Sequence, residues 1–289
     1  MLMKTSATDA FYESWREKTA IAFDRFLVHS RASQKIDTAY LPYELSKQIS
    51  DSDWSMLLGE IVSSSLMESA NGINEFRTRI NQLDAWARVI AELNEDDAMD
   101  TTLFLVSPIA YFCLLQPYAL KERLIHASTQ IIHQGNRRCF DDYQDKLPTD
   151  PVDLSQPKWP SGKEKFNALL KISKKKWLSS NELVKSLADL NSLHFEQATL
   201  RYRTKANHLI PPHFEMGLGP FVTRYFGTDD IPPIAKPKGV RVAYGFGGSP
   251  PLKISEIVSA CVSEHAAAVQ SYHCLEAVVC EIRDKVKSA

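Results

Sequence analysis

Residues 178–212, LSSNELVKSLADLNSLHFEQATLRYRTKANHLIPP, carry the clearest local structural signals in the chain. Ser179 followed by Glu182 is the pattern of a capping box, with Leu178 and Leu183 at the positions of a hydrophobic staple. Leucines then recur at helical spacing, at Leu183, Leu187 and Leu190. The pattern predicts a helix that begins next to Ser179.

The second half of this stretch indicates where the helical region breaks and where it ends. Ser192 can act as a second N-cap, so one long helix or two abutting helices both fit the pattern. Pro211 and Pro212 end the helix, because proline has no backbone N–H and restricts the residue before it. The basic residues from Arg201 to His208 are therefore predicted to lie in the last turns of a helix.

These last turns combine guanidinium groups with an imidazole. Helical residues that are seven apart differ in direction by about 20°, and residues five apart by about 140°. Arg201 is thus predicted to share a face with His208, whereas Arg203 points partly elsewhere. Histidine transfers protons near neutral pH, and arginine makes two-pronged contacts with phosphate oxygens. The combination suits a phosphate-containing substrate.

The run Arg203-Thr-Lys-Ala-Asn-His208 resembles the Arg-x4-6-His motif of the HEPN superfamily, and Arg201 also satisfies its longer spacing. Members of that superfamily are helical bundles, often dimeric and often metal-independent ribonucleases of toxin–antitoxin and phage-defence systems. The resemblance covers roughly residues 160–285 and is strongest around 195–212. It implies an RNA-cleaving helical protein.

The resemblance also implies a role for each polar residue of the motif. As catalytic residues, His208 would remove the 2′-hydroxyl proton or protonate the leaving oxygen, and Arg203 would stabilise the charged phosphoryl group. Arg201, Lys205 and Asn207 would bind and position the RNA backbone. Because Arg203 and His208 diverge on one helix, a site that uses both is easiest to build between two chains. We therefore expect a homodimer with His208 near its axis.

The rest of the chain predicts a mainly α protein, a helical bundle with a small β-hairpin inserted near residues 220–247. Thr8–Ser30 has the pattern of an amphipathic helix, and Gly135 is expected to end a helical region that starts at Thr101. Phe221–Phe226 and Val240–Phe246 favour strands, and Ile254–Lys285 favours a last long helix.

Two domain divisions fit this pattern. Residues 1–140 can form an N-terminal helical region and residues 160–289 a HEPN-like region, separated by a loop over 141–160 that is dense in Asp and Pro. Alternatively, the whole chain forms one continuous domain.

Composition limits the possible classes of function. A net charge of −1 gives no overall attraction to nucleic acid, so any such contact must come from a local patch. The five cysteines are odd in number and form no C-x-x-C, which argues against a disulfide framework and suits a reducing, cytoplasmic location. No His-Glu-x-x-His is present, and no two histidines stand four residues apart, so we expect no metal and no cofactor.

Two further segments leave alternatives open. Thr101–Leu120 has no charged residue, but its prolines and hydroxyls favour buried helices over a membrane span. Lys163–Lys176, with six lysines, can lie near a phosphate backbone or form an ordinary solvated helix face.

Two other functions are compatible with the sequence. The first is a non-catalytic helical interaction module, such as an antitoxin-like or accessory subunit that binds a protein partner or a nucleotide. Thr204 favours this function, because HEPN enzymes often carry Asn or another small polar residue directly after the motif arginine. The near-neutral charge of the chain also favours it. The second is a membrane-associated helical protein.

Overall fold

The computed structural model describes residues 7–32, 34–50, 54, 56–151, 159–174, 176–227 and 241–288. The chain is mainly α, as predicted. The helices are α1 (Ala7–Ala32), α2 (Glu44–Ser50), α3 (Met56–Glu92), α4 (Glu95–Thr101), α5 (Ser107–Cys139), α6 (Gly162–Ser173), α7 (Ser180–Asp189), α8 (Leu193–Ala198), α9 (Tyr202–His208) and α10 (Ile254–Ser288), with a π-helical segment, η1 (Thr102–Val106), between α4 and α5. The strands are β1 (Gly219–Gly227) and β2 (Arg241–Ser249).

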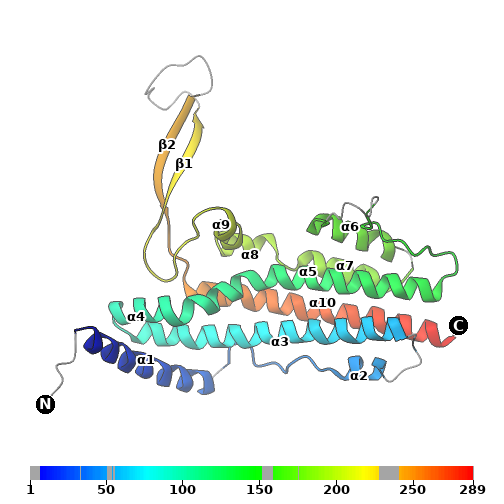
Figure 1. Cartoon of the computed structure of the whole chain (residues 1–289), viewed down its shortest axis with the longest axis horizontal. Coiled ribbons are helices and arrows are strands. Elements are labelled where there is room, and N and C mark those ends of the chain that lie inside the picture. The colour runs from blue at the N-terminus through cyan, green and yellow to red at the C-terminus, as the bar shows by residue number, and fades with distance from the viewer. Residues whose placement is uncertain are drawn as a thin grey trace.

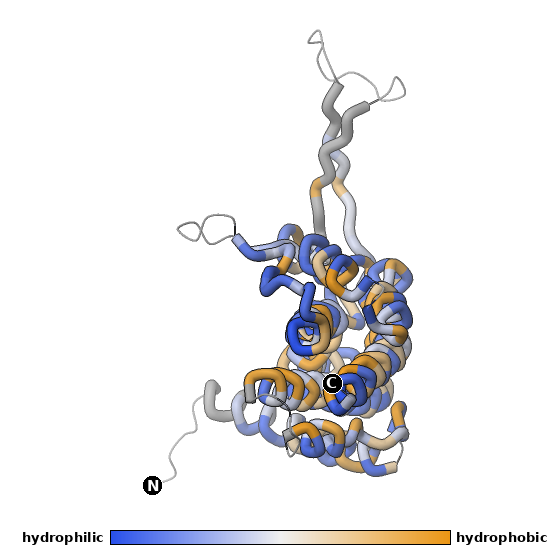
Figure 2. The backbone as a smooth tube through the Cα atoms, turned by 90° about the vertical axis from the view of Figure 1, so that its right-hand side faces the viewer, coloured by the Kyte–Doolittle hydropathy of each residue, from blue (hydrophilic) through white to orange (hydrophobic). Residues whose placement is uncertain are grey.

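Three long helices, α3, α5 and α10, lie side by side and form the centre of the bundle (Figure 1). Their facing side chains are fully buried, for example Ile73, Phe76 and Ile80 of α3 and Leu275 and Val279 of α10. Figure 2, which looks along the bundle, shows hydrophobic and hydrophilic residues alternating around these helices. Residues on both sides of the 141–160 loop therefore contribute to one core.

The prediction that Gly135 ends a helix is wrong. Helix α5 continues to Cys139, and Gly135 lies where α5 crosses α10. A Cβ atom at this position would stand 2.7 Å from Cδ1 of Ile282. The glycine thus provides space between two packed helices rather than a C-terminal cap.

The uncharged segment after Thr101 is helical throughout. Pro108 follows the π-helical segment η1, which joins α4 to α5 without a break, and Pro117 lies inside α5. Within the described residues, Glu95–Cys139 is long and apolar enough to cross a membrane, and 39% of its most apolar window is buried inside the molecule. Core helices of globular proteins have the same length and composition, so this property does not decide between the two environments.

Helix α1 lies at the edge of the bundle against α3 (Figure 1). It confirms the predicted helix over Thr8–Ser30, but only part of its apolar face is covered. Phe26 is buried and stacks on Trp86 with ring centroids 4.6 Å apart, whereas Ile21 and Phe23 are about half exposed.

Helices α6 to α9 form an outer layer over α5 and α10 (Figure 1). The predicted capping box at Ser179 is wrong, because the Ser179 side chain makes no capping hydrogen bond and Leu178 is exposed. The carboxylate of Glu281 on α10 instead accepts the backbone N–H groups of Leu178 and Ser179, at 2.7 and 3.0 Å. The capping box of this layer belongs to α6, where Ser161 and Glu164 cap each other's backbone N–H.

Of the two predicted alternatives, one long helix is wrong, and the helical region is broken twice, into α7, α8 and α9. The first break contains Ser192, which caps α8 as predicted by accepting the N–H of Phe195 at 3.0 Å. The buried carboxylate of Glu264 holds this break together, because it accepts the backbone N–H groups of Asn191 (2.6 Å) and Ser192 (3.1 Å) and the Ser192 hydroxyl (2.7 Å). The second break was not expected and lies at Thr199–Arg201.

The predicted hairpin is present, and it projects from the bundle (Figures 1 and 2). Strands β1 and β2 pair antiparallel from Gly219 opposite Ser249 to Gly227 opposite Arg241. The residues that connect the strands, 228–240, lie outside the described part of the chain.

Candidate functional site

The motif residues lie on α9 and on the residue before it. Arg201 is the N-cap of α9 and has a left-handed backbone, with φ 55°. Leu200 before it is also left-handed, with φ 52°, so the chain turns sharply between α8 and α9. The prediction that Arg201 shares a helical face with His208 is therefore wrong. Arg201 is exposed at the opposite end of α9 from His208.

Helix α9 is anchored by Tyr202. This side chain is buried, stacks on Phe214 with ring centroids 5.2 Å apart, and meets Tyr111 of α5 edge-on at 6.2 Å. Burial raises the pKa of Tyr202 to about 12, so the hydroxyl stays neutral at physiological pH. A tyrosine between two arginines thus positions the helix rather than supplying reactive chemistry.

The cations of α9 are held by neighbouring elements. The Arg203 guanidinium lies over the ring of Tyr118 on α5, with Cζ 3.9 Å from the ring centroid. The Lys205 ammonium donates to the hydroxyl of Ser249, at the base of β2, over 3.4 Å. Such contacts restrict the cations to one region of space, and a cation–π contact contributes roughly 0.5–2 kcal/mol.

His208 is exposed at the end of α9, together with Thr204 and Asn207. Within the described residues, the His208 imidazole has no hydrogen bond or ion pair, and none links it to Arg203. The N–H of Leu209 closes the helix on the carbonyl of Lys205 at 2.7 Å. The imidazole is therefore free to meet a substrate, but a single chain does not join it to Arg203.

The loop after α9 ties the hairpin to the start of α10. Glu215, with φ 60°, accepts the backbone N–H of Ile254 at 2.6 Å and an N–H of the Lys253 ammonium at 3.3 Å. Backbone bonds between His213 and Leu252 and between Leu252 and Glu215 complete this junction, at 2.8 and 3.1 Å. The base of the hairpin, and with it Ser249, is thereby fixed beside α9.

Sequence reasoning missed the residues that position the motif: Tyr118, Glu215, Ser249 and Glu264. Each is distant in sequence from α9 or belongs to a different element, and no local pattern marks it. The double break in the helical region is the one feature with a partial signal, in the Asn191-Ser192 pair.

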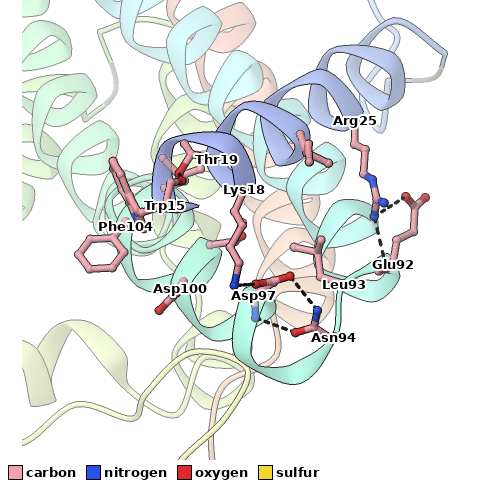
Figure 3. Close-up of a pocket in the computed structure, with 13 residues that line it drawn as sticks. Trp15, Lys18, Thr19, Arg25, Glu92, Leu93, Asn94, Asp97, Asp100 and Phe104 are labelled. Atoms are coloured by element: carbon pink, nitrogen blue, oxygen red, sulfur yellow. Dashed lines mark hydrogen bonds and ion pairs between the residues drawn. The ribbon is translucent and has the colours of Figure 1, made fainter. Parts of the chain in front are cut away.

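A separate cavity of about 230 Å³ lies between α1 and α4 (Figure 3). Trp15 and Phe104 meet edge-on at one end, with centroids 5.8 Å apart. Lys18 pairs with Asp97 at 2.7 Å, and this pairing raises the pKa of Lys18 and lowers that of Asp97. Arg25 and Glu92 approach within 3.8 Å. The facing charges of this cavity are thus largely satisfied by each other.

No metal centre is formed by the residues that the structure describes, because no group of three or more His, Cys, Asp or Glu side chains stands close enough to hold an ion. Comparisons of this chain with protein-family models, with curated proteins and with solved structures find no match.

Proposed function

We propose that this chain is a metal-independent, HEPN-like ribonuclease of the toxin or phage-defence type, acting in the cytoplasm as a homodimer. The observation that supports it best is His208, an exposed imidazole without a partner in the described chain. It stands on the same short helix as two cations, Arg203 and Lys205, which neighbouring elements hold in place.

The chemistry needs one proton carrier and one cationic group at the phosphate. His208 takes the proton from the 2′-hydroxyl as the new P–O2′ bond forms and the P–O5′ bond breaks. The leaving O5′ takes a proton from water and His208 returns its proton to solvent, which leaves a cyclic phosphate and a 5′-hydroxyl. The face of the Arg203 guanidinium packs on the Tyr118 ring. The N–H donors in the guanidinium plane stay available for two phosphate oxygens. Lys205, together with the exposed Arg201 and Asn207, positions the sugar–phosphate backbone of the RNA.

The site is proposed to be shared between two chains. Arg203 faces α5, whereas His208 lies exposed at the other end of α9, and no described contact links the two side chains. Two α9 helices brought together by a two-fold axis would place His208 of one chain near Arg203 of the other. Each dimer would then contain two equivalent sites.

A cleavage assay with EDTA present tests the chemistry. We expect His208→Ala to lose roughly 10²–10⁴-fold in cleavage rate, the usual contribution of general acid–base catalysis. His194→Ala is the matched control, because His194 is an exposed histidine on the adjacent α8. Cleavage that persists in both Arg203→Ala and His208→Ala, or that disappears with EDTA, would rule out this mechanism.

Mixing the two inactive variants tests the shared site. In a heterodimer of Arg203→Ala and His208→Ala chains, one site keeps both wild-type residues and the other keeps neither. We expect the mixture, after subunit exchange, to recover part of the wild-type activity. A mixture that stays inactive while forming heterodimers would place both groups in one chain.

A second candidate function is a non-catalytic interaction module that binds a protein partner, such as an antitoxin. Val222 of β1 and Phe246 of β2 stand opposite each other on the projecting hairpin and are 59% and 88% exposed. Tyr244 of β2, 62% exposed, lies two residues from Phe246 and therefore on the same face. Exposed apolar groups of this kind are typical of partner-binding surfaces. Growth arrest that depends on His208 on expression in cells supports the ribonuclease, whereas tolerated expression with a co-purifying protein supports the module.

A further inference from the structure

A lysine-lined cleft lies at the end of the outer layer that is remote from the hairpin. Its volume is about 360 Å³, and its walls come from the loop after α5 and the last turn of α6. Lys146, Lys171 and Lys176 line it together with Tyr143, and no carboxylate is among the lining residues. The cleft is therefore a local concentration of positive charge in a chain whose net charge is −1.

One of these ammonium groups is held in place by aromatic rings. Lys176 lies 4.1 Å from the ring centroid of Phe140 and 5.4 Å from that of Tyr143. The ammonium of Lys285, from α10, also lies 4.1 Å from the Phe140 centroid. Two ammonium groups thus contact the same ring, and an anion close to either of them is favoured electrostatically.

The loop that forms one wall of the cleft carries four carboxylates, Asp141, Asp142, Asp145 and Asp150, and those with described partners bind groups other than the lining lysines or bind them weakly. Asp150 accepts the backbone N–H of Leu147 at 2.7 Å. Asp145 is turned to His133 and Arg137, each at 3.0 Å. Asp142 approaches Lys176 only to 4.0 Å, and its side chain is 87% exposed. A pair at this distance whose carboxylate is exposed to solvent contributes little.

We propose that this cleft binds the phosphate backbone of single-stranded RNA. Lysine ammonium groups contact phosphates as point charges without reading sequence, and Tyr143 at the wall offers a partly exposed ring beside them. Helix α6 lies in the same outer layer as α9 (Figure 1), so a strand cut at His208 can extend along that layer to the cleft. The choice of RNA as the polyanion rests on the proposed ribonuclease function.

The test measures binding of a fluorescent single-stranded RNA by anisotropy, with EDTA, in a His208→Ala background so that the RNA stays intact. In Lys146→Gln/Lys171→Gln, which changes two exposed side chains, we expect binding to weaken roughly tenfold at low salt. The slope of log affinity against log salt should fall by about 1.4, since each phosphate contact on a single strand contributes about 0.7. The control is Lys35→Gln/Lys47→Gln, which removes the same charge from exposed positions in α2 and in the segment before it. Helix α2 lies on the opposite side of the bundle from α6 (Figure 1).

Four further measurements separate the possible outcomes. Lys176→Met keeps the packing stem over the rings and should also weaken binding, and thermal melting confirms that each variant is folded. Unchanged affinity in the lysine variants, or an equal loss in the control, overturns the proposal. So does lysine-dependent binding of inorganic triphosphate without binding of RNA. If the wild-type protein binds RNA through these lysines but does not cleave it, the proposed ribonuclease function is disproved, while the cleft remains an RNA-binding site.

Discussion

Replacing Glu264 with alanine should loosen the layer that carries the motif. The Glu264 side chain is 3% exposed in α10, and its carboxylate accepts three hydrogen bonds from Asn191 and Ser192 at the α7–α8 break. Alanine leaves two backbone N–H groups and one hydroxyl without their acceptor. The break has no other described acceptor for these groups.

The expected cost follows from these three bonds. A hydrogen bond to a charged group contributes about 1.5–3 kcal/mol, and the contributions do not add fully. Asn191 and Ser192 are half-buried, so water can replace part of what is lost, and removing the carboxylate also relieves its own desolvation. We expect Glu264→Ala to lower the free energy of unfolding by about 3 kcal/mol. For a chain of this length that corresponds to a decrease in Tm of about 5 °C.

Thermal melting and hydrogen exchange together check this reasoning. Glu264→Gln keeps one acceptor oxygen but turns an NH2 group toward a backbone donor. Its decrease in the free energy of unfolding should therefore be about half of that of Glu264→Ala. Glu256→Ala, an exposed glutamate on the same helix, is the control and should change the unfolding free energy by less than about 1 kcal/mol. Faster exchange should be confined to residues 190–208. If Glu264→Ala melts at the wild-type Tm and hydrogen exchange at residues 190–208 is unchanged, the Glu264 carboxylate does not organise the outer layer.

Two further perturbations have defined expected results. Burial, reinforced by the charge of Arg77, lowers the pKa of His265 to about 4, so the folded protein holds this imidazole neutral while the unfolded chain protonates it below about pH 6.5. The free energy of unfolding should thus fall by up to about 3 kcal/mol as the pH is lowered from 6.5 to 4. Measured by urea unfolding, it should depend less on pH in His265→Leu than in the wild type. Gly135→Ala should cost about 1–3 kcal/mol through overlap with Ile282, and Ile282→Val should recover part of that loss in the double variant, as measured by denaturant unfolding.

The fold class was predictable because it depends on patterns that act over one or two turns. Helical spacing of apolar residues located α1 and α10, and alternation with glycine and proline located the hairpin. The prediction for Gly135 was wrong because the local sequence does not distinguish a glycine that ends a helix from a glycine that makes room for a crossing helix. Only Ile282, far along the chain, distinguishes them.

The geometry of the candidate site was less predictable for a different reason. Ser179 and Glu182 satisfy a local capping pattern, yet the N–H groups at that helix start are bound by Glu281 from α10. Glu281 uses one carboxylate oxygen for each of the two adjacent N–H groups, and it prevails over the local partner. The same competition operates at Asn191, where Glu264 supplies the acceptor.

Helix α9 has seven residues, too few for an isolated helix to be stable in water, because nucleation cost exceeds the gain from so few hydrogen bonds. Its existence therefore depends on contacts made from outside: Tyr202 packed between Phe214 and Tyr111, and Arg203 held on Tyr118. The direction in which His208 points is consequently set by α5 and by the loop before the hairpin rather than by the motif. A substitution at Tyr111 should thus alter the function of this site without touching any residue of the motif itself.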